Sequence, residues 1–307
     1  MALKKQSNPN YALWALGGLF AFAVLVILAY AFALPIFSLP IDGCVGVIEI
    51  NGPLMTNDLP ATIFSDELLG SETLAKEIEN ANKRPDIKAL LVVIDSPGGS
   101  VVASKQVFDA IRSFNKPSVA YINELGTSGG YYVAAGTTYI VANPDAITGS
   151  IGARATFADM SVLFEKIGYN ETTIKSGAMK DLGSPSRPMS EEERSIIQSI
   201  VDESFQQFKS DILLARGDKL DMVGFASALD ARIMSGRQAK KIGLVDELGG
   251  KKAALSKAAQ LGGIKSEKPR ICELGSNKGK KGLFGSLGST AAELFLRNVH
   301  LPRIFYQ

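Results

Sequence analysis

The chain has 307 residues, of which 46% are hydrophobic, and this supplies enough apolar side chains for one sizeable core. The 33 Lys and Arg residues nearly balance the 31 Asp and Glu residues, so the formal net charge is only +2. A net charge this small does not attract nucleic acid, and it argues against that class of function. One histidine and two cysteines also argue against metal sites built on several of these ligands.

The first distinctive segment is an apolar run at residues 11–34. No charged residue lies between Gln6 and Asp42. A helix over this run, rising about 1.5 Å per residue, exceeds the roughly 30 Å hydrocarbon core of a bilayer. We therefore predict a transmembrane helix at 11–34.

The charges on either side of this run predict its orientation. Lys4 and Lys5 precede it, and no basic residue follows it until Lys76. Because positive residues stay on the cytoplasmic side, we expect a cytoplasmic tail at 1–10 and the rest of the chain outside the plasma (inner) membrane. A cleaved signal peptide is the alternative, since residues 29–31 (AYA) have the small-x-small pattern of a cleavage site.

From residue 45 onward, short apolar runs alternate with helix-like segments. Residues 87–94 form a continuous apolar run that ends at a Ser-Pro-Gly-Gly turn, which is typical of a strand buried in a parallel sheet. Further strands are expected at 45–50, 117–122, 139–142 and 269–274, and helices at 71–83, 100–113, 129–135, 239–242 and 251–261. A capping box at Ser190 and Glu193 predicts the start of another long helix. This alternation predicts an α/β fold with a parallel sheet flanked by helices, in a domain at 43–274.

The last part of the chain, residues 275–307, differs in composition. Residues 275–288 are rich in Gly, Lys and Ser, which is typical of a linker or loop. The apolar residues that follow fit either a docking helix or a segment lying on a membrane, and the pattern does not choose between them.

The two cysteines, Cys44 and Cys272, lie near opposite ends of the chain and have no partner at metal-ligand spacing. We expect two small, buried hydrophobic side chains, because free cysteine is commonly buried. A disulfide between them is the alternative.

The position of the single histidine limits the chemistry. His300 follows the predicted linker, too far along the chain to reach a site in the α/β core, so a Ser-His-Asp or Cys-His arrangement is not expected. If the chain is a hydrolase, a buried lysine is the best candidate base, because burial lowers the pKa of a lysine toward neutrality and leaves an amine that accepts a proton.

A serine flanked by glycines follows the strand predicted at 117–122. In Gly126-Thr-Ser128-Gly-Gly130, small residues let a substrate backbone approach Ser128, and the Gly129 N–H lies at a helix start, where amides are unpaired. A second donor could come from the turn that ends at Gly99. Because neighbouring parallel strands deliver their following loops to one edge of the sheet, we expect these two turns to meet. The alternative for Ser128 is an ordinary helix-capping serine.

Several blocks of sequence, in order, match one known family. They are Asp95–Ser100 (DSPGGS), Ser128–Tyr132 (SGGYY), Thr148–Gly152 (TGSIG), Lys175–Asp181 (KSGAMKD), Ser184–Arg187 (SPSR), Gly236–Ala239 (GRQA) and Gly243–Asp246 (GLVD). Through these blocks the chain resembles signal peptide peptidase A, in its short single-repeat form, within the Clp protease and crotonase-like superfamily.

The resemblance implies a Ser–Lys catalytic dyad. It makes Ser128 the nucleophile and Lys180 the general base, with Ser150 orienting the lysine amine and with Gly99 and Gly129 as oxyanion donors. Lys175 is the alternative base, since related double-length enzymes use a lysine nearer that position. Asp181 must not pair with the amine of the base, because an ion pair would keep that amine protonated.

The resemblance also implies a function: a membrane-anchored serine endopeptidase, a hydrolase that degrades remnant signal peptides and other small membrane-derived peptides. It needs no metal or organic cofactor, and family members assemble into homo-oligomeric rings. One alternative is a Ser–Lys membrane protease with a specific protein substrate, of the stomatin-associated type. The others are a catalytically silent membrane-anchored scaffold and a crotonase-like acyl-CoA enzyme.

Overall fold

The computed structural model describes residues 10–37, 43–61 and 67–275. The chain divides into two units at Gly43, and each is considered by itself. The predicted tail at 1–10, except its last residue, and nearly all of the predicted segment at 275–307 lie outside the described residues.

The first unit contains a single helix, α1 (Asn10–Phe37). Its described apolar side chains are exposed, from Trp14 to Tyr30. Across the described residues, no helix is both long and apolar enough to cross a membrane. The span expected at 11–34 is therefore not found there.

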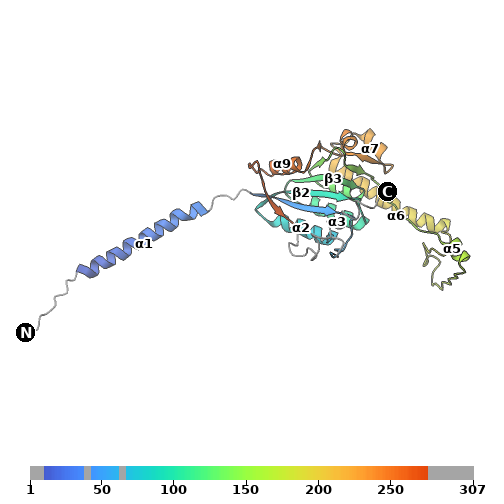
Figure 1. The fold of residues 1–307 in the computed structure, drawn as a ribbon, viewed down its shortest axis with the longest axis horizontal. Coiled ribbons are helices and arrows are strands. Elements are labelled where there is room, and N and C mark those ends of the chain that lie inside the picture. Colours follow the sequence, from blue (N-terminus) through green and yellow to red (C-terminus); the bar gives the residue numbers. More distant parts are fainter. Residues whose placement is uncertain (1–9, 38–42, 62–66, 276–307) are drawn as a thin grey trace, which may run out of the picture. The chain divides into compact units, whose positions relative to one another are not determined.

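The second unit is built on one sheet of eight strands within its described residues (Figure 1). The strands are β1 (Cys44–Asn51), β2 (Ile87–Ser96), β3 (Ser118–Thr127), β4 (Tyr139–Ala142), β5 (Ile147–Gly149), β6 (Ile233–Ser235), β7 (Glu247–Leu248) and β8 (Arg270–Glu273). The main order is β6-β5-β3-β2-β1-β8, with β4 pairing β3 and β7. Every pairing is parallel except that of β5 with β6. The predicted α/β fold with a mostly parallel sheet is confirmed.

Helices cover both faces of this sheet (Figure 1). The helices that follow α1 are α2 (Ser71–Lys83), α3 (Val101–Arg112), α4 (Gly129–Ala135), α5 (Ser161–Lys166), α6 (Glu191–Arg216), α7 (Met222–Ala228), α8 (Gly236–Lys241) and α9 (Lys251–Leu261). Alternate residues of β2 belong to different apolar clusters: Leu90 and Val92 pack with α2, α3 and α4, while Leu91 and Val93 pack with α9. Both faces are buried, which is why β2 is apolar throughout.

One segment leaves the sheet. Figure 1 shows α5 and its flanking loops along the outer end of α6, away from the strands. We call residues 153–200 the arm. The predicted capping box is confirmed, because Ser190 accepts a hydrogen bond from the Glu193 amide while the Glu193 side chain accepts one from the Ser190 amide, and α6 begins there. The far half of α6 packs on the core through Phe208 and Ile212.

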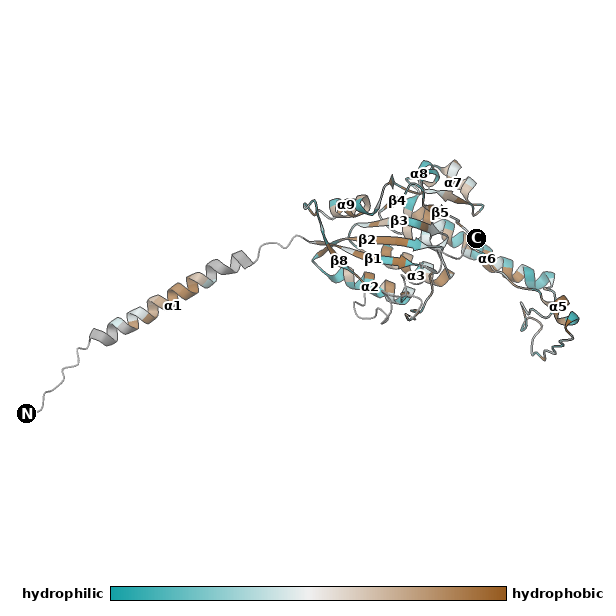
Figure 2. Cartoon of the chain, viewed as in Figure 1, coloured by the Kyte–Doolittle hydropathy of each residue, from teal (hydrophilic) through white to brown (hydrophobic). Residues whose placement is uncertain are grey.

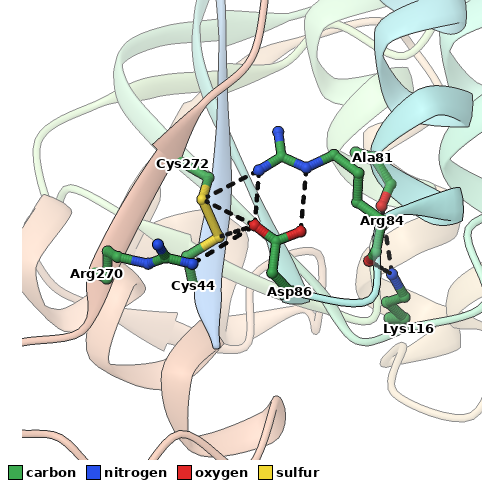
Figure 3. The surroundings of a disulfide bond; sticks show 7 residues. All are labelled: Cys44, Ala81, Arg84, Asp86, Lys116, Arg270 and Cys272. Carbon is green, nitrogen blue, oxygen red and sulfur yellow. Dashed lines mark hydrogen bonds and ion pairs between the residues drawn. A yellow bond between two sulfur atoms is a disulfide. The ribbon is translucent and has the colours of Figure 1, made fainter. Parts of the chain in front are cut away.

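The expectation of two separate thiols is wrong, because Cys44 and Cys272 form a disulfide. β8 pairs in parallel with β1, and this register places Cys272 opposite Gly46, two residues from Cys44. A pairing between the first and last strands of the domain cannot be read from cysteine spacing. Figure 3 shows the bond with Arg84, Asp86 and Arg270 around it.

Removing the disulfide should destabilise the domain. It joins residues 228 apart in sequence, and losing a bridge over so long a loop typically costs about 2–5 kcal/mol of unfolding free energy. We expect Cys272→Ser to lower the denaturant midpoint of the domain. In the same measurement, reductant should lower the midpoint of the wild type and leave that of the variant unchanged. A wild-type midpoint that does not respond to reductant would mean that the bond contributes nothing.

Candidate active site

Ser128 lies in a strained turn between β3 and α4. Its backbone has φ 53° and ψ −122°, a conformation that a residue with a side chain rarely adopts. Its amide donates to the Gly149 carbonyl at 2.9 Å, and its carbonyl accepts from the Tyr132 amide. The hydroxyl makes no capping bond to α4, so Ser128 is not the helix-capping serine of the alternative reading. Strain of this kind costs about 1–3 kcal/mol and gathers at functional sites.

The two glycine-bearing turns meet at this point, as expected. A side-chain carbon added at Gly98 would lie 2.6 Å from the Gly129 nitrogen and 2.9 Å from the Ser128 Cβ. Gly98 also has φ +98°, in the region that favours glycine. Only glycine at this position lets the turn after β2 approach the nucleophile turn so closely.

Two backbone N–H groups flank the nucleophile. Gly129 is the first residue of α4, where helix amides have no partner within the helix. The turn at Gly99 is held by Leu54, whose amide donates to the Gly98 carbonyl at 2.8 Å and whose carbonyl accepts from the Ser100 amide at 2.9 Å. The Gly99 N–H, which lies between these two bonds, has no acceptor among the described residues. The arrangement fits a pair of oxyanion donors.

Ser150 lies beside Ser128 at the same edge of the sheet. Thr127 of β3 pairs with Gly149 of β5, and each serine is the next residue along its strand. Ser150 also has φ 53°, and its amide donates to the Arg232 carbonyl at 2.9 Å. Ser128, Ser150 and the two glycines are therefore brought together.

Lys180 is not brought to this group. It lies in the arm, its side chain is exposed, and no hydrogen bond or ion pair of the described residues joins it to either serine. The segment between β5 and α6 that carries it follows the outer end of α6 (Figure 1). Within one copy of the chain, the nucleophile therefore lacks the predicted base.

The alternative base, Lys175, is held in an ion pair. Its ammonium lies 2.5 Å from Asp181 and also donates to the Ala178 carbonyl. Arg187 bridges Asp181 and Glu193. Hydrogen bonds from Arg187 and then Lys175 hold the pKa of Asp181 far below its usual range. Asp181 does not pair with Lys180, which leaves that amine as the better candidate.

Two tyrosines of α4 anchor the nucleophile turn. The Tyr131 hydroxyl donates to the Leu244 carbonyl at 2.9 Å, and the Tyr132 hydroxyl donates to Asp211. Tyr132 also stacks on Phe208 of α6, with ring centroids 4.3 Å apart. Burial, with the Asp211 bond, raises the pKa of Tyr132 strongly, so the hydroxyl stays a donor. Sequence reasoning included these tyrosines in a matching block but assigned them no role.

A cavity of about 650 Å³ lies in the arm and not at the serines. Residues 153–159 form one side of it, and 183–201 contribute the other lining residues. Neither Ser128 nor Ser150 lines it.

The strained serine and the two N–H groups beside it define a site suited to acyl transfer by a serine nucleophile. The model of Peptidase family S49 matches residues 110–265. The chain belongs to this family of serine proteases.

Individual relatives agree with the family. "Putative protease MJ0651" of Methanocaldococcus jannaschii is 39% identical over 64% of this chain and 64% of its own length. "Putative protease slr0021" of Synechocystis is 40% identical over 56% of this chain and 62% of its own length. "Putative signal peptide peptidase SppA" of Enterococcus faecium is 31% identical over 68% of this chain and 60% of its own length. The chain thus spans slightly less than two thirds of these relatives.

A solved structure of a membrane-bound stomatin-specific protease aligns over 77% of this chain and 99% of that chain. Its sequence identity is 14% and its TM-score is 0.43, which is too low to establish a shared fold. The Clp protease and crotonase-like assignment stays a prediction.

The ion-pair cluster of the arm should respond to acid. Hydrogen bonds from Arg187 lower the pKa of Glu193 from 4.5 to about 2. A carboxyl group with a lowered pKa stabilises the folded arm above pH 4.5, and this contribution is lost as the pH falls toward 2. We expect the protection of the amides at the start of α6 against exchange, relative to their intrinsic rate at each pH, to fall over that interval. Glu193→Gln should weaken the response and leave the part that Asp181 contributes, while Glu191→Gln, an exposed neighbour in the same turn, should keep it in full. If amide exchange in Glu193→Gln responds to acid as in the wild type, a group other than Glu193 causes the response.

Proposed function

We propose that the protein is a membrane-anchored serine endopeptidase that uses Ser128 and Lys180 to degrade remnant signal peptides and other small membrane-derived peptides. The observation that carries the catalytic part is the strained, partly exposed Ser128 beside the N–H groups of Gly99 and Gly129. The name of the Enterococcus faecium relative, "Putative signal peptide peptidase SppA", supports the substrate class.

The proposed reaction is acyl transfer in two steps. The Ser128 hydroxyl oxygen attacks the peptide carbonyl while neutral Lys180 takes the hydroxyl proton, and Gly99 and Gly129 donate to the oxyanion. Collapse of this intermediate breaks the C–N bond, and Lys180 returns the proton to the leaving amine. Water then attacks the acyl-enzyme as Lys180 takes its proton, and this releases Ser128. Ser150 orients the lysine amine, and the reaction needs no cofactor.

We propose that a second copy of the chain supplies Lys180. The exposed position of Lys180 in the arm supports this, as does the unusual number of exposed apolar side chains there, such as Ile174, which is 96% exposed. The others are Phe157, Met160, Val162, Leu163, Ile167, Tyr169, Ile196 and Ile200. Exposed apolar side chains gathered on one segment of a protein mark an interaction site. A contact between the arm of one copy and the serine edge of the next is head-to-tail, and such a contact generates a ring when the rotation between copies closes.

Membrane attachment on the outer side is also proposed, through residues 11–34. Two observations support it. The described side chains of α1 are almost all apolar and exposed, as Figure 2 shows along the helix. The Cys44–Cys272 disulfide fits an oxidising compartment such as the outer side of the plasma membrane.

The dyad is tested with a fluorogenic peptide that carries a small apolar residue before the scissile bond. We expect Ser128→Ala and Lys180→Ala each to lower turnover by roughly a thousandfold or more, while Lys175→Ala keeps activity. Co-assembling equal amounts of the two inactive variants should restore activity to about a quarter of the sites. Half of the copies then carry Ser128, and about half of the neighbours of these copies carry Lys180. Assembled mixtures that stay inactive would place the dyad within one chain. An inactive wild type would favour the scaffold alternative.

Membrane attachment is tested by fractionation of the full chain. We expect the wild type to remain in the membrane pellet after alkaline extraction. The double variant Leu25→Arg, Ile27→Arg should be released, because each arginine costs about 2.5–3.5 kcal/mol at the centre of a membrane helix. Val223→Arg, at an exposed position of the second unit, should stay in the pellet. Equal retention of all three would argue against attachment through α1.

A further inference from the structure

Basic side chains gather at the edge of the sheet where the strands begin. Arg84 and Lys88 lie at the start of β2, Lys116 precedes β3, and Lys265, Lys268 and Arg270 precede or open β8. These strands are parallel neighbours in the order β3-β2-β1-β8, so all of their starts share one edge. We call these six residues the basic collar.

Contacts join three of the six members, directly or through Asp86. The Lys116 ammonium donates to the Arg84 carbonyl at 2.6 Å. Arg84 and Arg270 both reach Asp86, at 2.8 and 3.5 Å. The disulfide fixes the start of β8 beside Cys44, and Figure 3 shows Arg84, Arg270 and Lys116 gathered around it.

Among the described residues, the carboxylates in the loops of the collar do not balance its positive charge. Asp86 is shared by two arginines, and Glu267 is the other described carboxylate in these loops. Lys88, Lys265 and Lys268 are exposed and make no ion pair within the described residues. Burial, and then repulsion from Lys88, lowers the pKa of Lys116. Crowded cations of this kind are relieved by an anionic partner.

The position of the collar in the chain indicates which anionic partner it binds. Cys44 opens β1 at the same edge, and only residues 38–43 separate it from α1. Seven Cα–Cα steps span at most about 25 Å. A bilayer that holds α1 is therefore always within reach of this edge.

We propose that the basic collar docks the protease domain on the anionic lipid headgroups of the membrane that holds α1, an inference that rests on the proposed membrane attachment. Ser96, Ser128 and Ser150 lie at or just beyond the opposite ends of β2, β3 and β5. Ten residues of β2 span about 33 Å, so docking holds the nucleophile roughly that far from the headgroups. The substrates of the docked enzyme are then peptides released from the bilayer, or tails long enough to reach the site.

The test uses residues 43–275, which contain both apolar clusters of the domain in full and lack α1. Sedimentation with vesicles should show binding when they contain phosphatidylglycerol and none when they are pure phosphatidylcholine. Binding should fall steeply at about 0.5 M salt, where surface charges are screened. The triple variant Lys88→Gln, Lys265→Gln, Lys268→Gln should bind on the order of a hundredfold more weakly, at roughly fivefold per lysine.

A matched control removes the same charge elsewhere, with Lys166→Gln, Lys209→Gln and Lys252→Gln, and should bind like the wild type. Equal loss in both triple variants, or equal binding to neutral vesicles, would overturn the proposal. Binding to a soluble polyanion such as heparin as tight as that to anionic vesicles would also overturn it. Peptide cleavage by the collar variant should be unchanged in solution. That assay reports on the dyad separately from docking.

Discussion

The pairing of β3 with β2 on one side and with β5 on the other is the constraint on which the site depends. Gly126 lies opposite Ser96, and Thr127 lies opposite Gly149. Because these strands are parallel, the turns that follow them reach one edge, and residues far apart in sequence become neighbours. The nucleophile turn, the Gly98–Gly99 turn and Ser150 all owe their positions to these two pairings. Leu54, which continues from β1, fixes the glycine turn through the same parallel arrangement.

The strain at Ser128 needs a rigid support, and α4 supplies it. Every residue of this short helix is buried, and its two tyrosines bond to Leu244 and Asp211 on other parts of the chain. A turn joined to so rigid a helix cannot relax to a more common backbone conformation without breaking these contacts. The free energy of core packing thus holds the partly exposed serine in its strained backbone conformation.

Elements with strong apolar patterns could be predicted from the sequence, while features that depend on long-range pairing could not. The helices predicted at 71–83 and 251–261 match α2 and α9, because a buried face repeats at the helical period. β3 runs to Thr127, five residues beyond the predicted end at 122, because its polar middle breaks the apolar run while pairing resumes with β5. The disulfide was missed for the same reason, since only the pairing of β8 with β1 brings its cysteines together. At the site, parallel topology was enough to predict that the glycine turns meet. Nothing in the sequence indicated that Lys180 lies in an arm away from them.

The exposed position of Lys180 has a physical reason under the proposed mechanism. A catalytic lysine must be neutral, and burying its amine without a carboxylate favours that form but costs free energy in the isolated chain. In the arm, Asp181 pairs with Lys175 and Arg187, and no carboxylate among the described residues pairs with Lys180. The Lys180 side chain is exposed to solvent in the single chain, and contact with a second copy would remove that solvent beside the serines. The desolvation that activates the base would then be offset by burial of the apolar arm, which makes activity depend on assembly.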